Sequence, residues 1–154
     1  MKALTWIFAL SVTLLAGCGT MGKDNKPAVI AKENLHRVIG RQWELKTLTL
    51  DGQRVVMDLD ANMTITFGAD GRATGFGSVN QYSNRYTFTE DGQLKWAGPS
   101  FVTTRRAGPP ELMQKERIYL EALGKVSRGI LKGHDLQLQS DDGATVLPFT
   151  EAGY

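Results

Sequence analysis

The stretch MTITFGADGRATGFG, residues 63–77, decides the fold class. Met63, Ile65 and Phe67 alternate with threonines, so their apolar side chains fall on one face of an extended strand. The Asp-Gly pair that follows supplies the positive φ angles that a tight hairpin turn needs. Because each such pair is flanked by alternating residues, it predicts two antiparallel strands, and Asp-Gly also occurs at 51–52, 91–92 and 142–143.

Extending this pattern outward predicts about ten short strands, near 41–50, 53–58, 62–68, 72–77, 84–90, 93–97, 100–105, 129–133, 135–140 and 144–150. In the first of these the apolar phase slips after Leu45, which predicts a bulge or bend near Lys46-Thr47. A meander with this many strands tends to close into a barrel, because closure removes exposed edges. The sequence therefore predicts a mainly β fold, a single antiparallel barrel.

One segment interrupts the strands. From Pro110 to Ser127 the apolar residues Leu112, Tyr119 and Leu123 recur at helical spacing. We expect an amphipathic helix whose apolar stripe covers an open end or face of the sheet. Residues 28–39 show only a loose helical pattern, and they predict either a short helix or an extra strand that leads into the domain.

The N-terminus has the pattern of a secretory signal. Lys2 precedes 13 uncharged, mostly apolar residues, which is too short a stretch for a stable membrane span. The segment ends in Leu-Ala-Gly-Cys at Cys18, the sole cysteine, and this resembles the lipobox of bacterial lipoproteins. The resemblance implies cleavage after residue 17 and lipid on Cys18, including a palmitate-type acyl chain. Gly19 rather than Asp then favours the outer membrane, with the domain facing the periplasm.

Composition excludes several kinds of protein. The net charge of +2 over 154 residues argues against nucleic-acid binding by bulk charge. One cysteine excludes an intramolecular disulfide, and two histidines argue against a multi-histidine metal site. We therefore expect no metal and no cofactor. Residues 19–27 are polar and contain glycine, so we assign 18–39 to the lipidated cysteine and a tether.

The order of features resembles the META domain family, typified by HslJ-like bacterial lipoproteins. Trp43-Glu44-Leu45 opens the pattern, the 63–67 strand follows, and Gly75 to Tyr82 stands where the family has a Gly-x-x-Gly-Cys-Asn-x-Tyr type of stretch. The likeness covers about residues 40–150. Val79 replaces the cysteine that many members carry. The resemblance implies a lipocalin-like antiparallel barrel with a packed helix, and it implies no established catalytic residue.

Two segments are candidate sites for a partner or a ligand. The first contains Gly75, Gly77, Asn80 and Tyr82, which could form a lip at the barrel mouth. Its structural interpretation is a glycine-bent strand with Asn80 bonding its own backbone in a turn. The second is the basic loop with Arg105 and Arg106, which could bind a phosphate or an acidic partner.

The function expected from these features is a non-enzymatic outer-membrane lipoprotein that supports envelope maintenance or stress tolerance by binding an envelope component. A carrier of a small apolar ligand inside the barrel is one alternative. The other is a protein inhibitor of an envelope-directed lytic enzyme or protease, acting through a projecting loop at Thr103–Pro110. An enzyme would need a convergent nucleophile, base and orienting group, and the sequence shows no such motif.

Overall fold

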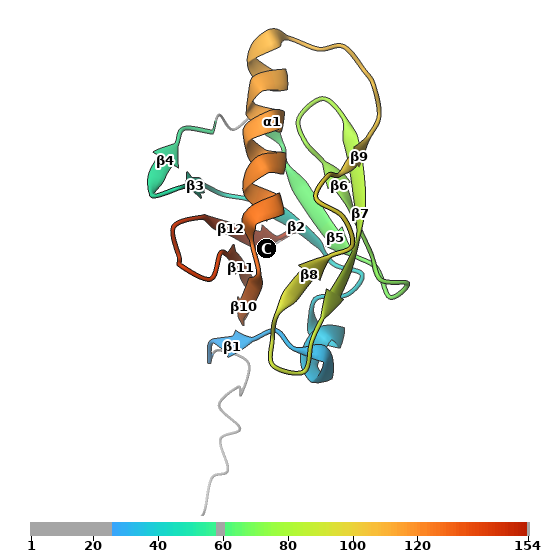
Figure 1. Cartoon of the computed structure of the whole chain (residues 1–154), viewed down its shortest axis with the longest axis vertical. Coiled ribbons are helices and arrows are strands. Elements are labelled where there is room, and N and C mark those ends of the chain that lie inside the picture. The colour runs from blue at the N-terminus through green and yellow to red at the C-terminus, as the bar shows by residue number, and fades with distance from the viewer. Residues whose placement is uncertain (1–25, 58–60, 154) are drawn as a thin grey trace, which may run out of the picture.

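The computed structural model describes residues 26–57 and 61–153 of the chain. The predicted signal peptide and Cys18 lie outside the described residues. Twelve strands, one short 3-10 helix and one α-helix make up the described part (Figure 1). In chain order they are β1 Ala28–Val29, η2 Lys32–Arg37, β2 Gln42–Leu45, β3 Leu48–Leu50, β4 Gln53–Val55, β5 Thr64–Phe67, β6 Arg72–Phe76, β7 Gln81–Phe88, β8 Leu94–Trp96, β9 Val102–Thr103, α1 Pro110–Lys125, β10 Arg128–Lys132, β11 Asp135–Gln139 and β12 Val146–Glu151.

The strands form one curled antiparallel sheet. Its order is β1-β10-β11-β12-β2-β5-β6-β7-β8, with the β3–β4 hairpin joined to β12 and with β9 joined to β7. The backbone N–H of Leu94, at the start of β8, donates to the carbonyl of Ser127 beside β10 at 2.7 Å. The two ends of the curl therefore approach each other, and the predicted mainly β architecture is confirmed as a half-barrel with one helix.

All four Asp-Gly pairs lie between antiparallel strands, as predicted: β3–β4, β5–β6, β7–β8 and β11–β12. In the first pair both residues have left-handed backbone, with φ of 51° at Asp51 and 79° at Gly52. The predicted bend is also present. The segment 41–50 divides into β2 and β3, and between them the backbone N–H of Lys46 donates to the Pro148 carbonyl at 2.9 Å.

Most predicted strand boundaries shift by one to three residues, and two differences from the sequence prediction bear on the site and on the extent of the domain. β7 begins at Gln81 rather than at residue 84. The chain turns at 77–80, and the two strands already pair directly beside this turn, at Phe76↔Gln81. The folded domain also begins before residue 40. Residues 28–39 contain both a strand and a 3-10 helix, and Ile30 and Val38 are buried in the core. Residues 28–39 therefore belong to the folded domain and not to a tether, and the rest of the assigned range up to residue 25 lies outside the described residues.

Helix α1 packs into the hollow of the curled sheet, as its apolar stripe predicts (Figure 1). Tyr119, Ala122 and Leu123 face inward and are fully buried. The core that they complete contains large side chains from the inner sheet face that are at most 1% exposed, including Trp43, Phe67 and Phe149. Each such side chain stabilises the fold by about 1.5–3 kcal/mol. Among the described residues, no helix is both long and apolar enough to cross a membrane.

Candidate binding site

The tip of the β6–β7 hairpin is fixed to helix α1 by one buried carboxylate. Glu116 is 8% exposed, and its Oε2 accepts the backbone N–H of Val79 at 3.1 Å and of Asn80 at 2.6 Å. Its Oε1 accepts the side-chain amide of Asn80 at 2.8 Å. Hydrogen bonds to a charged acceptor are worth about 1.5–3 kcal/mol each. These bonds compensate the desolvation of the carboxylate and fix the hairpin tip on the helix.

The side chain of Asn80 extends this attachment to the segment before the helix. Its Oδ1 accepts the hydroxyl of Thr104 and the backbone N–H of Arg106, both at 2.8 Å. Asn80 is itself only 5% exposed. The expectation that Asn80 bonds its own backbone in a turn is wrong, because its amide joins three separate segments. We call Glu116, Asn80, Thr104 and the Arg106 backbone the Glu116–Asn80 network.

Two backbone features make room for this network. A side chain at Gly77 would place its Cβ 2.9 Å from Glu116 Cγ, so only glycine lets the carboxylate approach. Ser78 adopts a φ of 96°, a left-handed conformation that non-glycine residues rarely hold unless their surroundings impose it. The tight turn at 77–80 is therefore shaped around the carboxylate of Glu116.

Gly75 and Tyr82, the other two candidates in this stretch, serve the core. The Tyr82 hydroxyl lies 2.8 Å from that of Tyr119 and donates to the Thr64 carbonyl at 2.7 Å. A Cβ at Gly75 would lie 2.5 Å from the Tyr82 hydroxyl, so the glycine lets the phenol cross its strand. Burial raises the pKa of Tyr82 and of Tyr119 well above the usual value. Both phenols therefore stay neutral and act as hydrogen-bonding groups inside the fold.

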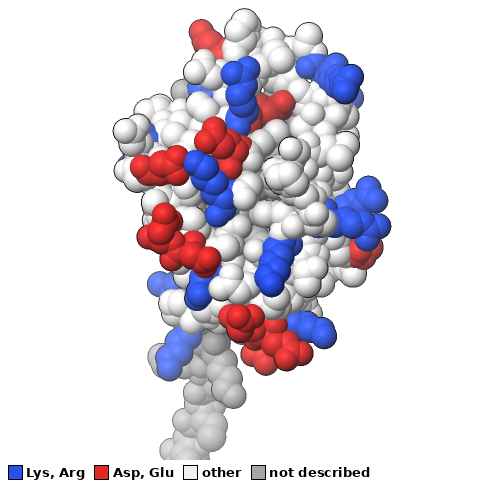
Figure 2. All heavy atoms as spheres, in the orientation of Figure 1, with Lys and Arg blue, Asp and Glu red and all other residues white. Residues whose placement is uncertain are grey.

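Beside the Glu116–Asn80 network lies a basic surface hollow of about 490 Å³. Arg105 and Arg106 line it from the segment before the helix, and Arg117 lines it from α1. All three side chains are exposed, and none forms an ion pair with another described residue. Figure 2 shows basic side chains at the upper right, where the segment between β9 and α1 runs in Figure 1. We call this surface the arginine hollow.

The segment at 103–110 does not project freely. Asn80 holds the backbone of Arg106, and Gly108 packs so closely that a Cβ there would lie 2.8 Å from Val79 Cγ1. The segment presents the side chains of Arg105 and Arg106 to solvent on a backbone that is hydrogen-bonded in place. In the described part of the chain, no group of three or more His, Cys, Asp or Glu side chains is placed to hold a metal ion.

The structure thus separates the six candidate residues by role. Asn80 and the Arg106 backbone belong to the Glu116–Asn80 network, and Gly77 makes room for it, whereas the arginine side chains face solvent. The sequence interpretation missed Glu116. Its spacing carried a signal, since Leu112, Glu116, Tyr119 and Leu123 share one helix face, and a carboxylate inside an apolar stripe needs a buried partner.

Residues 34–153 match the family model of the META domain. The chain belongs to the META domain family. Its fold is similar to the NMR structure of a protein from Burkholderia xenovorans, with 23% identity and a TM-score of 0.63 over 79% of this chain and 88% of that one. It is also similar to the crystal structure of a DUF4847 family protein from Bacteroides vulgatus, with 13% identity and a TM-score of 0.55 over 75% of this chain and 94% of that one. No curated protein matches the sequence.

The family match confirms the resemblance inferred from residues 40–150 and extends it toward the N-terminus. It includes Asn34, whose side chain links the backbone of Val29 and Ala31. This META domain therefore includes the 3-10 helix as well as the sheet and α1. Val79 contributes its backbone N–H to the carboxylate of Glu116. The attachment of the hairpin here rests on hydrogen bonds.

The Glu116–Asn80 network predicts that Glu116→Gln, a nearly isosteric substitution, strongly destabilises the fold. In Glu116→Gln one oxygen becomes an amide that donates, so it can no longer accept all three hydrogen bonds. We expect the free energy of unfolding to fall by about 1.5–3 kcal/mol, measured by urea denaturation.

Glu121→Gln is the matched control on the same helix. The side chain of Glu121 is 54% exposed and pairs only with Lys125 among the described residues, so the expected change is within about 0.5 kcal/mol. Equal stability of the two variants would show that the buried carboxylate contributes nothing beyond its surface counterpart.

Proposed function

We propose that this META domain protein is a non-enzymatic bacterial lipoprotein of the outer membrane that binds an acidic envelope protein through its arginine hollow. Its physiological role would be envelope maintenance or stress tolerance. The observation that carries the proposal is a set of three exposed arginines without ion-pair partners among the described residues, next to a segment whose backbone is hydrogen-bonded in place.

The lipid anchor is supported by the sequence. Cys18 is the only cysteine, and it ends an apolar segment of signal-peptide length in a lipobox-like Leu-Ala-Gly-Cys. The first described strand, β1, begins at Ala28, so few residues separate Cys18 from it in the sequence. This arrangement would keep the domain close to the membrane that holds the lipid.

The chemistry of the arginine hollow favours a protein as the partner. The described residues that line the hollow include three arginines and one carboxylate, that of Glu116, which is already hydrogen-bonded. Met113 in the same hollow is 38% exposed, and Leu120 lines it as well. Arginine and methionine are both enriched at protein interfaces, and a guanidinium binds a carboxylate through two parallel hydrogen bonds.

The two alternatives fit the geometry differently. An inhibitor of a lytic enzyme would use the same arginine hollow, so it is one form of the proposed partner binding. A carrier of a small apolar ligand would need space inside the sheet. The interior is instead occupied by large side chains such as Trp43 and Tyr119, which are 1% and 0% exposed.

The anchor is tested by Cys18→Ala. The wild-type protein should incorporate a labelled fatty acid and sediment with the outer-membrane fraction. The variant should incorporate none, because the acyl chains are attached at this residue. Equal labelling of the two proteins, or a wild-type protein that is recovered without membrane, would contradict the proposal.

The arginine hollow is tested by Arg105→Ala together with Arg106→Ala. We expect chemical cross-linking in the native envelope to give a wild-type adduct that the double variant loses by about tenfold, as two charge-assisted contacts would imply. Raising the salt concentration should weaken the adduct, since exposed charges are screened.

Arg54→Ala is the control, because Arg54 is exposed on β4, away from the hollow. An adduct that is retained in the double variant, or that is lost equally in the control, would rule out the hollow as the binding surface. Native mass spectrometry of the captured complex then gives the mass of the partner.

A further inference from the structure

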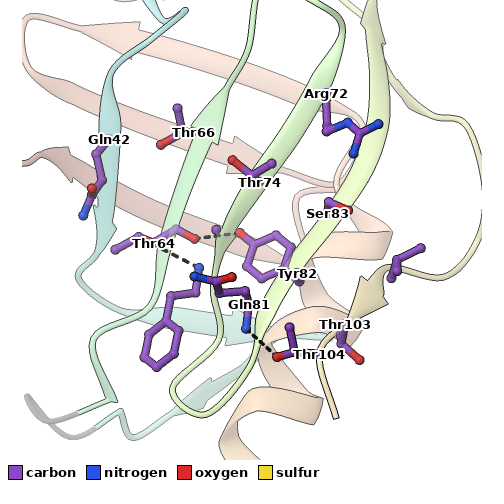
Figure 3. A pocket seen from close by; sticks show the side chains of 13 residues that line it. Gln42, Thr64, Thr66, Arg72, Thr74, Gln81, Tyr82, Ser83, Thr103 and Thr104 are labelled. Atoms are coloured by element: carbon purple, nitrogen blue, oxygen red, sulfur yellow. Dashed lines mark hydrogen bonds between the residues drawn. The ribbon is translucent and has the colours of Figure 1, made fainter. Parts of the chain in front are cut away.

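We propose that a second, hydroxyl-lined groove on the outer face of the sheet binds an acidic oligosaccharide. The groove has a volume of about 600 Å³ and crosses β2, β5, β6, β7 and β9 (Figure 3). This volume lies within the range of about 300–1,000 Å³ that is usual for ligand sites. The site is separate from the arginine hollow, although Thr103 and Thr104 line both.

The polar side chains of the groove are aligned by the strand register. Gln42 pairs with Thr66, Thr66 with Thr74, and Thr74 with Ser83. Residues opposite each other share a sheet face, so the four side chains form a row across the strands, as Figure 3 shows. None of the four has a hydrogen-bond partner for its side chain among the described residues. Each could both donate and accept, which matches the hydroxyl groups of a sugar.

The floor of the groove is rigid. The Thr64 hydroxyl accepts the backbone N–H of Phe76 at 3.2 Å, and the Thr104 hydroxyl accepts that of Gln81 at 3.2 Å. Beneath them the Tyr82 hydroxyl is held by the Thr64 carbonyl. The half-buried ring of Phe76 also lines the groove, and it offers an apolar surface on which the C–H face of a sugar ring can pack.

Charge distinguishes this groove from an ordinary exposed strand surface. Arg72 lines one end, and it stands directly opposite Arg85 in the register of β6 and β7. Like charges in that position destabilise a sheet, and neither arginine forms an ion pair with a described residue. Among the described residues, no carboxylate lines the groove. A carboxylate on the ligand would relieve the repulsion and accept paired hydrogen bonds from a guanidinium.

Other ligand classes fit less well. A bound peptide strand would need a free sheet edge, whereas the row of polar side chains lies on β2, β5, β6 and β7, each of which is paired on both sides. A nucleic acid would need several cations along its backbone, and Arg72 is the one cation among the described residues that line the groove. A sugar chain that carries a carboxylate can bind both the row of polar side chains and the guanidinium groups of Arg72 and Arg85.

The test is equilibrium binding of a galacturonic acid oligomer to the full chain in mild detergent, with an uncharged glucose oligomer of equal length as comparison. We expect the acidic oligomer to bind at least about tenfold more tightly, as a paired guanidinium contact implies. Arg72→Gln together with Arg85→Gln should remove that preference while leaving the stability of the fold equal or higher. Thr74→Val, which removes one hydroxyl at constant shape, should weaken the binding of both oligomers.

The controls separate the two sites. Arg105→Ala with Arg106→Ala should leave oligosaccharide binding unchanged, and Arg54→Gln should do the same. Absence of binding, equal binding of both oligomers, or retention of the preference in the Arg72 and Arg85 double variant would overturn the proposal. Loss of binding in the Arg105 and Arg106 variant alone would also overturn it, because the acidic sugar would then occupy the arginine hollow.

Discussion

The buried carboxylate of Glu116 is the constraint on which the rest of the site depends. It lies on the inner side of α1, where an unpaired charge would cost several kcal/mol, and it is compensated by the hairpin tip at 79–80. Asn80 then transmits this attachment to Arg106. One side chain thus joins the helix, the sheet and the segment that connects β9 to α1. Gly77 and the left-handed Ser78 are local consequences of the same contact.

This constraint gives the two surface sites a common base. The strand-like segment Val102–Thr104 pairs with β7 and separates the arginine hollow from the hydroxyl-lined groove. Thr104 bonds both Asn80 and the Gln81 backbone, so movement of this segment would disturb both surfaces. Binding sites that are fixed before the ligand arrives lose less entropy on binding. A buried network of this kind explains physically how a small domain can bind ligands on a rigid face.

The sequence predicted the sheet well because its signals are local. Asp-Gly at 51–52 and 142–143 needs only its own backbone geometry to turn the chain, and the phase slip after Leu45 marked a real bend. The start of β7 was harder to predict. Gly75 and Gly77 looked like turn residues, but tertiary contacts require both glycines. Gly75 leaves room for Tyr82, its partner across the hairpin, and Gly77 leaves room for Glu116, which is distant in sequence.

The candidate site shows the same limit. The sequence singled out Asn80, Arg105 and Arg106 by residue type, and all three lie at the arginine hollow. It could not assign the partner of Asn80, since 36 residues separate Asn80 from Glu116. The sequence also could not predict the row of polar side chains in the groove, because Gln42, Thr66 and Ser83 come together only through strand register.

Amide hydrogen exchange tests the central claim most directly. If Glu116 fixes the hairpin and the following segment, the amides of Asn80 and Arg106 exchange as slowly as those of the core strand β5. In Glu116→Gln both should lose protection, although Arg106 shares no hydrogen bond with Glu116 among the described residues and is linked to it through Asn80. Fast exchange in the wild-type protein, or protection at Arg106 that survives the substitution, would show that the network does not hold this surface in place.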